Sequence, residues 1–257
     1  MIRDAATKVM ECRTCGYRFT NPRPSQPEIA AAYSAPAQYD GWLAQDAGRE
    51  VMWHQRWALV KRYAKGRSLL DVGAGIGTFL GLAHADGWEV TGTEISKSAI
   101  AIARERHGVA LIEGQLEAIS TSGQFDLVTM WHVLEHLPSP SQAVTRCRDL
   151  LKPGGLVVVA VPNDSDARWR FQRLKNGTYM PYEDMEPGKE IHLSHFTVGV
   201  LRRTLESRGF SVELATVDDH YPDRSPRHDR LVATYRTLMA WTGWNLGVAT
   251  LVMARAV

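Results

Sequence analysis

The sequence predicts an α/β fold with a doubly wound, mostly parallel β-sheet, and three observations support this. From Ser68 onward, short runs rich in Val, Ile and Leu alternate with stretches of helical pattern, as expected where crossover helices connect parallel strands. A glycine-rich turn, "GAGIG", separates the first of these strands from the first helix. Two later apolar runs, "FSVELATV" and "GVATLVMARAV", predict an antiparallel pair of strands at one edge of the sheet.

The individual elements follow in chain order. Residues 21–36 are rich in proline and alanine and predict an extended arm, and residues 48–65 predict a helix with an apolar side formed by Val51, Trp57, Leu59 and Val60. The first five strands of the sheet are expected at residues 69–72, 89–94, 109–112, 125–131 and 156–161. The helices between and after them are expected at residues 77–85, 97–106, 141–151, 196–208 and 227–244. The helix 141–151 is expected to end at "KPGG", because Pro153 cannot continue a helix and Gly154 or Gly155 can adopt positive φ.

Composition restricts the class of protein. With 257 residues, 44% of them hydrophobic and 23% charged, the chain can bury a full core. A net charge of +2 is too small to indicate a nucleic-acid or membrane partner. Three cysteines argue against a disulfide framework and favour a reducing, cytoplasmic location, and the start "MIRDAATKVMEC" does not resemble a signal peptide. The apolar stretch 238–254 is interrupted by Gly243, Asn245 and Gly247, which favours a helix end, a turn and a buried strand over a membrane span; a helix on a membrane surface is the alternative.

The glycine-rich turn indicates a nucleotide-type ligand. Its spacing is G-x-G-x-G, through Gly73, Gly75 and Gly77, whereas the dinucleotide fingerprint is G-x-G-x-x-G and would need glycine at Thr78. Asp71, two residues before Gly73, would repel a phosphate and attract a cation. S-adenosylmethionine carries an ammonium and a sulfonium and no phosphate, so it fits this charge pattern better than NAD. A tight turn without a ligand is the alternative interpretation.

Glu94 supplies a second indication of a nucleoside. It ends the expected strand 89–94, about twenty residues after the glycine turn, where a carboxylate can accept hydrogen bonds from a ribose diol. NAD and S-adenosylmethionine both contain ribose, so Glu94 does not choose between them. A capping role at the helix that begins near Ser96 is the structural alternative.

Taken together, these segments resemble the class I S-adenosylmethionine-dependent methyltransferases. The resemblance rests on "LLDVGAGIGTFL", "VTGTEIS", "EGQLEAI", "FDLVTMWHVLEHLPSP" and "LLKPGGLVVVAVPN", which cover residues 65–163 in the family's order. "HLSHFTVGVLRRTLESRGFSVE" is similar to the subgroup that methylates small molecules. The resemblance implies a Rossmann-like sheet of seven strands with the last one antiparallel. It also implies an enzyme, with a non-catalytic adenosylmethionine-binding scaffold as the alternative.

Carried over by position, the resemblance implies a set of residues around the cofactor. Asp71, Gly73, Ala74 and Gly75 would line the methionine end, Glu94 would hold the ribose, and Ile95 would lie against the adenine. Gln115 and Leu116 would flank the adenine ring, although many relatives have an acid near Gln115, so its contact can be through the backbone alone. Met130 and Trp131 would face the sulfonium.

Just past the strand 125–131, "WHVLEH" supplies titratable side chains where ligands of open α/β sheets bind. His132 is the first choice for a general base, since histidine titrates near neutral pH. His136 and His195 are further candidates for catalysis, although His136 and Glu135 could also simply fix the loop. Related O-methyltransferases use a similar E-x-x-E-H run plus a later histidine or acid to hold a divalent metal. This would make His132, Glu135 and His136 ligands here, with His192 or His195 as the fourth. We expect no metal, because hard Mg²⁺ prefers carboxylate oxygen to the imidazole that His132 offers.

Cys12, Cys15 and Gly16 have the spacing of half a zinc knuckle. The only other cysteine, Cys147, lies in the helix expected at 141–151, so one chain of this sequence cannot supply a four-cysteine site. A remnant hairpin without zinc is the expected structure, and a site completed by histidines is the alternative.

We expect residues 1–47 to form an N-terminal arm and residues 48–257 a methyltransferase domain, with 163–195 and 218–245 as insertions near the active site. The first insertion contains Trp169, Phe171, Tyr179 and Tyr182, a possible lid, and basic residues at positions 168, 170, 175 and 189. The planar guanidinium of arginine pairs well with phosphate. These residues therefore favour an acidic acceptor such as a sugar nucleotide over a neutral natural product. The expected reaction is O-methylation of a sugar-containing or natural-product hydroxyl, with methylation at carbon or nitrogen as the alternative. Nucleic acid is not expected as a partner, although "RWRFQRLK" could contact it.

Overall fold

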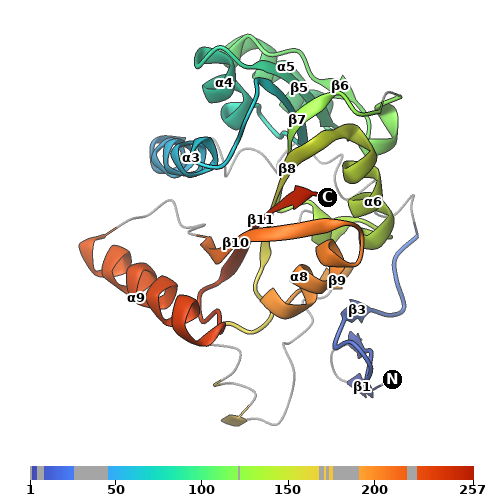
Figure 1. Cartoon of the computed structure of the whole chain (residues 1–257), viewed down its shortest axis with the longest axis vertical. Helices are drawn as coiled ribbons and strands as arrows, with labels where there is room; N and C mark the ends of the chain where they lie inside the picture. Colours follow the sequence, from blue (N-terminus) through green and yellow to red (C-terminus); the bar gives the residue numbers. More distant parts are fainter. Residues whose placement is uncertain are drawn as a thin grey trace.

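A seven-stranded sheet forms the centre of the fold in the computed structural model of the chain (Figure 1). The structure describes residues 2–4, 9–25, 46–120, 122–167, 171, 174–175, 191–218 and 225–257. The strand order is β10 (Phe210–Asp218), β11 (Ala249–Ala256), β8 (Leu151–Pro162), β7 (Phe125–Trp131), β4 (Ser68–Val72), β5 (Glu89–Glu94) and β6 (Ile112–Glu113). β11 runs antiparallel to β10 and β8, and the other neighbours are parallel. The expected α/β class and the antiparallel last strand are therefore confirmed.

Helices cover both faces of this sheet. They are α3 (Asp46–Lys61), α4 (Thr78–Ala85), α5 (Lys97–His107), α6 (Pro140–Leu150), α8 (Val198–Glu206) and α9 (Pro226–Thr242), together with the short 3₁₀ helices η2 (Leu116–Ala118) and η3 (Leu134–His136). Local sequence accounts for several ends: the Ser96 side chain accepts a hydrogen bond from the amide of Ala99 at the start of α5, and Gly108, with φ 68°, ends it. None of the helices in the described ranges is long and apolar enough to cross a membrane.

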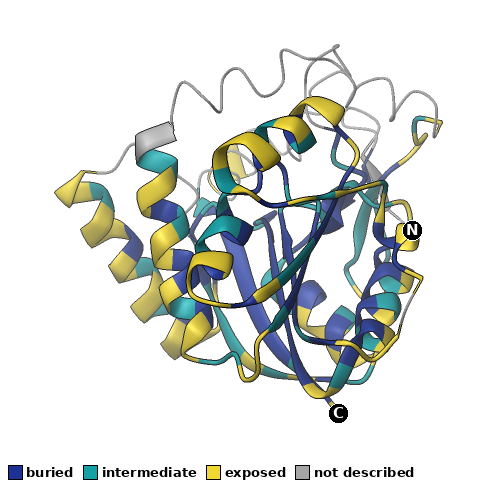
Figure 2. Ribbon diagram, turned by 90° about the horizontal axis from the view of Figure 1, so that it is seen from above, coloured by how far each residue is buried: buried dark blue, intermediate teal, exposed yellow. Residues whose placement is uncertain are grey.

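Alternation along the strands divides the core into two layers (Figure 2). On one face, Val128 and Met130 of β7 pack with α6 and α8. On the other face, Leu127 and Trp131 of the same strand pack with α3, α4 and α5. The central strands are buried on both sides, which explains why they read as continuous apolar runs rather than alternating ones.

Two predicted boundaries are wrong for identifiable reasons. The strand expected at 109–112 is only β6, Ile112–Glu113, because the amide of Val109 still donates to the carbonyl of Ala103 at the end of α5. The helix expected at 141–151 ends at Leu150, and Leu151 already pairs with Phe125 as the start of β8. "KPGG" therefore forms an irregularity within β8, with Gly154 at φ 72°, instead of the end of a helix.

The helix expected at 48–65 is α3, Asp46–Lys61, and its predicted apolar side is confirmed at Trp57, Leu59 and Val60 but not at Val51. Val51 is 49% exposed, whereas Met52, Arg56, Trp57 and Val60 are buried. A charged side chain thus occupies the face that was expected to be wholly apolar. The acidic partner that compensates the charge of Arg56 is part of the candidate active site described below.

A second, smaller sheet was predicted only in part: the hairpin expected at Cys12 and Cys15 is present, but its pairing with further strands was not expected. It consists of β1 (Ile2–Asp4), β2 (Val9–Glu11), β3 (Arg18–Thr20) and β9 (Ser194–His195), in that order and all antiparallel. Arg18 of this sheet forms ion pairs with Glu11 (2.9 Å) and with buried Asp164 (2.5 Å). The described part of the predicted arm is therefore joined to the main body through β9, and residues 26–45 of the arm lie outside the described ranges.

Candidate active site

The carboxyl ends of four parallel strands meet at one edge of the large sheet. Glu94 is the last residue of β5, Trp131 of β7 and Asp218 of β10, and Asp71 is the last residue but one of β4. β10 points in the same direction as β8 because both are antiparallel to β11 between them. This edge is where open α/β sheets bind their ligands.

The glycine-rich turn between β4 and α4 adopts a conformation that favours glycine. Gly73 and Gly75 have φ of 67° and 56°, and a Cβ on Gly73 would lie 2.6 Å from a methyl carbon of Val133. The amide of Ala74 donates to the carbonyl of Thr93, which ties the turn to β5. The backbone is thus held in a tight curve over the ends of β4 and β5.

Asp71 is buried beneath this turn, with 2% of its surface exposed. The Thr129 hydroxyl donates a hydrogen bond to its Oδ1 at 2.6 Å. Burial raises the pKa of Asp71 to about 7 against the opposing effect of this hydrogen bond, with a further increase from Glu94. A carboxyl group that titrates near neutrality would be stabilised in its ionised form by a cation placed nearby.

Glu94 holds the turn through its two carboxylate oxygens. Oε2 accepts the amide of Gly75 at 2.9 Å, and Oε1 accepts the amides of Ile95 and Ser96 at 2.8 and 2.9 Å. The bonds to Ile95 and Ser96 are those of the capping alternative, whereas the bond to Gly75 links the carboxylate to the glycine turn.

The remaining residues expected around the cofactor differ in exposure. Ile95 is 40% exposed and Gln115 is exposed just before η2, whereas Leu116, Met130 and Trp131 are buried. Met130 packs in the layer with α6 and α8, and Trp131 in the layer with α3 and α4.

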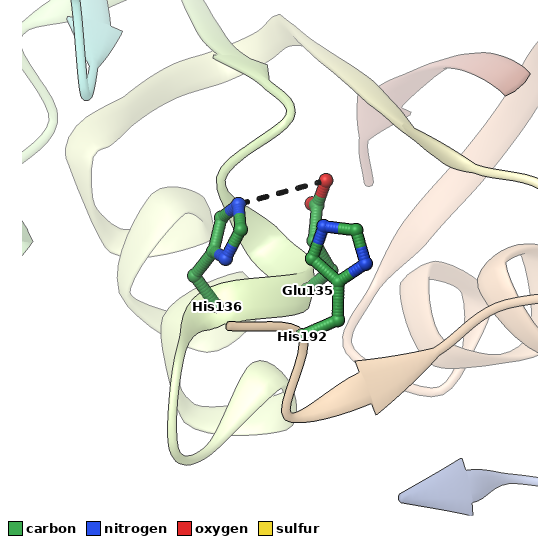
Figure 3. Close-up of side chains that lie close together, drawn as sticks. All are labelled: Glu135, His136 and His192. Carbon is green, nitrogen blue, oxygen red and sulfur yellow. Dashed lines mark ion pairs between the residues drawn. The ribbon is translucent and has the colours of Figure 1, made fainter. Parts of the chain in front are cut away.

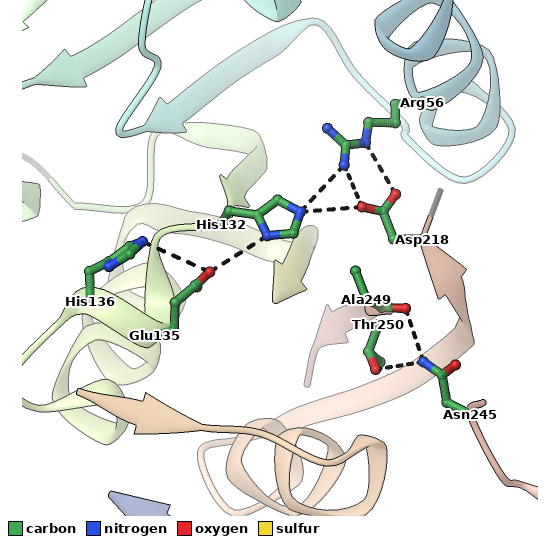
Figure 4. Close-up of polar contacts among 8 residues, drawn as sticks. All are labelled: Arg56, His132, Glu135, His136, Asp218, Asn245, Ala249 and Thr250. Carbon is green, nitrogen blue, oxygen red and sulfur yellow. Dashed lines mark hydrogen bonds and ion pairs between the residues drawn. The ribbon is translucent and has the colours of Figure 1, made fainter. Parts of the chain in front are cut away.

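His132 lies between two acidic groups just after β7 (Figure 4). Its Nε2 is 3.4 Å from Asp218 Oδ2, and its Nδ1 is 3.6 Å from Glu135 Oε1. Burial alone would lower the pKa of His132, but Asp218 and then Glu135 outweigh burial and raise it. His132 is also the one non-glycine residue with positive φ (57°) in the described ranges, and such outliers often mark functional sites.

Arg56 and Asp218 complete this cluster and were missed in the sequence. The Arg56 guanidinium donates to both carboxylate oxygens of Asp218, and both side chains are about 95% buried or more. Burial would raise the pKa of Asp218, but Arg56 and His132 hold it well below its usual range. Arg56 also lies over the ring of Trp53 at 4.6 Å and over that of Trp131 at 4.8 Å.

A sequence pattern could have pointed to Arg56. Trp53, Arg56, Trp57 and Val60 are spaced three, one and three residues apart, so they share one side of a helix. An arginine on an apolar helical stripe needs an acidic partner, and the carboxyl end of a predicted strand, where Asp218 lies, was a place to look. The pattern does not identify the partner, because the two residues are 162 positions apart.

A second cluster contains Glu135 and His136 of η3 and His192 just before β9 (Figure 3). One potential ligand atom from each lies within 4.8 Å of the others. His136 Nδ1 is 2.7 Å from the carbonyl oxygen of Ile191, which leaves its Nε2 facing Glu135 Oε1 at 3.9 Å. Neither oxygen of Glu135 has a hydrogen-bond partner in the described part of the chain, although the carboxylate is 1% exposed.

This cluster differs from the expected set of four ligands. His132 contacts Glu135 but does not belong to the group of three. Burial would raise the pKa of Glu135, but the three histidines His132, His136 and His192 together lower it. An anionic, buried carboxylate with two imidazoles beside it is a donor set that suits a borderline divalent ion such as Zn²⁺.

His195 lies in β9, paired with Arg18 of β3. Its Nε2 is 3.1 Å from Thr20 Oγ1. Burial lowers the pKa of His195 to about 4, with smaller contributions from His192 and Arg18. The structure therefore ties His195 to the small sheet and does not bring it into either cluster.

Most of the first predicted insertion lies outside the described residues, including Trp169, Tyr179, Tyr182 and the basic residues 168, 170 and 189. Phe171 is described and is 67% exposed, and Lys175 is exposed as well. The predicted lid and the predicted basic lining therefore stay predictions.

Comparison with known families agrees with this geometry. A family model described as "Methyltransferase domain" matches residues 46–215. This match begins at α3 and extends into β10, so it covers the glycine turn, Arg56, His132 and the cluster of Glu135, His136 and His192, but not Asp218. The hairpin of β2 and β3 lies outside it.

Curated relatives are similar over the same central part. The ubiquinone biosynthesis O-methyltransferase of Pseudomonas paraeruginosa is 34% identical over 113 residues, which are 41% of this chain and 49% of that protein. The protein of the same name from Alkalilimnicola ehrlichii is 37% identical over 118 residues, 43% of this chain and 47% of that protein. The chain thus spans about half the length of the curated relatives it matches.

Solved structures show the same fold at low sequence identity. A possible histamine N-methyltransferase from Thermotoga maritima superposes with a TM-score of 0.61 at 16% identity, covering 88% of this chain and 99% of that one. The magnesium protoporphyrin IX methyltransferase of Synechocystis, solved with bound S-adenosylhomocysteine, gives 0.61 at 14% identity and covers 90% and 100%. At these identities the likeness establishes the fold alone.

Proposed function

The chain belongs to the class I S-adenosylmethionine-dependent methyltransferases, and from that premise we propose that it transfers a methyl group to a hydroxyl oxygen of a small molecule. The observation that carries this proposal is the position of His132. It follows the strand whose end borders the glycine turn, and carboxylates flank both of its ring nitrogens. In this proposal the basic side chain of His132 lies beside the methyl donor.

The residues at the strand ends would bind and orient the cofactor. In the proposal, Glu94 holds the ribose, the turn at Gly73 and Gly75 allows the methionine end to approach the backbone, and ionised Asp71 favours the cationic donor. Methyl transfer is an in-line displacement at an activated carbon, so alignment and exclusion of water provide most of the catalysis.

His132 would remove the proton from the acceptor hydroxyl. The step starts from neutral His132, which accepts the hydroxyl proton on one ring nitrogen, and Asp218 and Glu135, which raise its pKa, stabilise the imidazolium that forms. Arg56 would fix Asp218 and thereby the imidazole ring. We propose that His136 orients the loop through its contact with Ile191, and that His195 has a structural role.

For the acceptor, we propose a hydroxylated small molecule of the sugar-containing or natural-product kind. The curated relatives are named as O-methyltransferases of ubiquinone biosynthesis, so phenolic ring hydroxyls belong in the same test. The experiment is calorimetric titration with S-adenosylmethionine, S-adenosylhomocysteine and NAD, followed by turnover with panels of sugar nucleotides and catechols. Binding of NAD alone would overturn the family-based proposal, and adenosyl binding without turnover would favour the scaffold alternative.

A metal-dependent version of this reaction is the second candidate. The observation that favours it is the group Glu135, His136 and His192, in which His136 presents Nε2 because Nδ1 faces a backbone carbonyl. These three residues would hold the ion, and a bound divalent ion would bring the acceptor hydroxyl in and lower its pKa. Chelation followed by re-addition of Mn²⁺, Mg²⁺ or Zn²⁺ distinguishes the two versions. If the chelator does not change turnover, the three residues only stabilise the loop.

A further inference from the structure

The helix α9 presents large apolar side chains on its outer surface. Trp241, in the last turn of the helix, is 87% exposed, and Trp244, just after the helix, is 59% exposed. Leu231, in the second turn, is 48% exposed. Leu238 lies seven residues after Leu231 and three before Trp241, so these three side chains share one side of the helix. The candidate active site does not use this side of α9.

The opposite side of α9 fixes the helix on the body of the protein. Val232 and Met239 are buried and pack with Val217 of β10. The Arg236 guanidinium also donates a hydrogen bond to the carbonyl oxygen of Val217, at 3.2 Å. Figure 1 shows α9 at the periphery of the molecule, beyond the edge strand β10. The exposure of Trp241 is therefore a property of a helix that is packed in place.

The charges of α9 favour an anionic partner. The helix contains the three basic residues Arg227, Arg230 and Arg236 and one acidic residue, Asp229, so its formal charge of +2 equals that of the whole chain. Arg227 and Arg230 are exposed in its first two turns. Arg230 lies eleven residues before Trp241, which is close to three full turns, so both point to the same side. A net charge that is small over the whole chain is thus concentrated beside exposed apolar side chains.

We propose that α9 attaches the chain to the surface of a membrane that contains anionic lipid, with the helix lying along the surface. Tryptophan is favoured at the boundary between headgroups and acyl chains, and a basic side chain beside it is attracted to anionic headgroups. Val217, against which α9 packs, directly precedes Asp218 of the candidate active site. Attachment would therefore hold that site close to the lipid, whatever the methyl acceptor is.

The size of the exposed apolar surface favours lipid over a second protein. A fully exposed tryptophan presents roughly 250 Å², so Trp241 and Trp244 together offer about 370 Å². Each partner in a stable protein interface contributes about 800 Å². A few aromatic anchors with basic neighbours are enough at a membrane surface, because lipid accepts each inserted side chain without a complementary protein surface.

The test mixes the full chain with vesicles of phosphatidylcholine alone, or of phosphatidylcholine with phosphatidylglycerol, and measures the bound fraction by sedimentation. We expect binding to the anionic vesicles that weakens as the salt concentration is raised, and much weaker binding to the neutral vesicles. Anionic vesicles with brominated acyl chains should quench part of the tryptophan fluorescence, because the indoles reach the acyl boundary.

Variants assign the binding to α9. Trp241→Ser/Trp244→Ser should weaken binding to the anionic vesicles by about tenfold or more and should remove the quenching. Arg230→Ser should weaken binding by about fivefold. The matched control Arg104→Ser removes an exposed arginine from α5, beside the opposite edge of the sheet, and should leave binding unchanged. Circular dichroism checks that each variant is folded as the wild type is.

Three results would overturn the proposal: no binding to the anionic vesicles, equal binding of the wild type and the double serine variant, or equal weakening by Arg230→Ser and Arg104→Ser. The last result would indicate adsorption through charge spread over the whole surface. Native mass spectrometry tests the remaining alternative. A wild-type dimer that does not bind vesicles, and that dissociates in Trp241→Ser/Trp244→Ser, would assign this side of α9 to a second copy of the chain instead.

Discussion

Replacing Asp71 with asparagine tests the electrostatics of the glycine turn quantitatively. Burial raises the pKa of Asp71 from 3.8 to about 7 in the folded protein. One pKa unit corresponds to about 1.4 kcal/mol, so the ionised carboxylate destabilises the ligand-free fold by about 4 kcal/mol above neutrality. Asparagine is close to isosteric and can still accept the hydrogen bond from Thr129.

The sign follows from proton linkage. Between pH 3.8 and about 7 the unfolded chain has released the Asp71 proton while the folded chain retains it, so wild-type stability from this group falls as pH rises. The Asp71→Asn variant lacks this decrease. Its stability relative to wild type should therefore rise by about 3 kcal/mol from about pH 5 to about pH 8 and then stay constant.

Denaturant unfolding of the ligand-free proteins at several pH values measures this difference. Asp126→Asn is a suitable control, because hydrogen bonds from Ser68 and Lys152 outweigh burial and lower the pKa of Asp126 to about 2. Its difference from wild type should be constant between about pH 5 and pH 8. A constant difference for Asp71→Asn as well would refute the argument that Asp71 titrates near neutrality.

Further predictions concern the two clusters and the cofactor. Glu94→Ala should weaken S-adenosylmethionine binding by about 1–3 kcal/mol, measured by calorimetry, and an unchanged affinity would remove Glu94 from the ribose site. His132→Asn should lower kcat by about 10²–10⁴-fold with little change in cofactor affinity, and full activity would exclude it as the base. Arg56→Met should destabilise the fold by about 3–5 kcal/mol in thermal unfolding, because the charge of Asp218 is left buried without its partner. The double variant Arg56→Met/Asp218→Leu should lose less stability, and an equal loss would show that the effect does not come from the unpaired charge. If the metal-dependent version holds, Glu135→Gln should abolish the stimulation of turnover by added Mn²⁺, and persistent stimulation would place the ion elsewhere.

The sheet was predictable because its determinants are local. Strands 89–94 and 125–131 were predicted at the bounds that the structure has, since their apolar runs are bounded by turns and polar residues. The pairing of the last two strands also followed from pattern. The start of β8 at Leu151 could not be predicted from pattern, because proline and two glycines normally indicate a break in a strand. Only the neighbouring strand β7 determines that Leu151 pairs with Phe125.

The site was predictable to the extent that it follows motifs in continuous sequence. Asp71, the glycines, Glu94 and His132 are read from short segments, and the structure places them at one edge of the sheet. Arg56 and Asp218 come together only in the folded chain, as do His136 and His192. The pairing of β9 with the hairpin was missed for the same reason, because β9 has only two residues and is recognisable as a strand only through its pairing with β3.

The position of β11 has a consequence for the order in which the sheet assembles. β10 and β8 are not adjacent in the sheet, because residues 249–256 lie between them as β11. This side of the sheet therefore forms only when strands that are far apart in the sequence pair with each other. Such non-local pairings slow folding, whereas β4, β5 and β7 can associate through nearby segments. Since Asp218 is the last residue of β10, the half of the site at β4 and β5 should become protected from amide hydrogen exchange before the half that contains the Arg56–Asp218 pair. A refolding chain would therefore hold the expected cofactor end in place while its acceptor end is still forming.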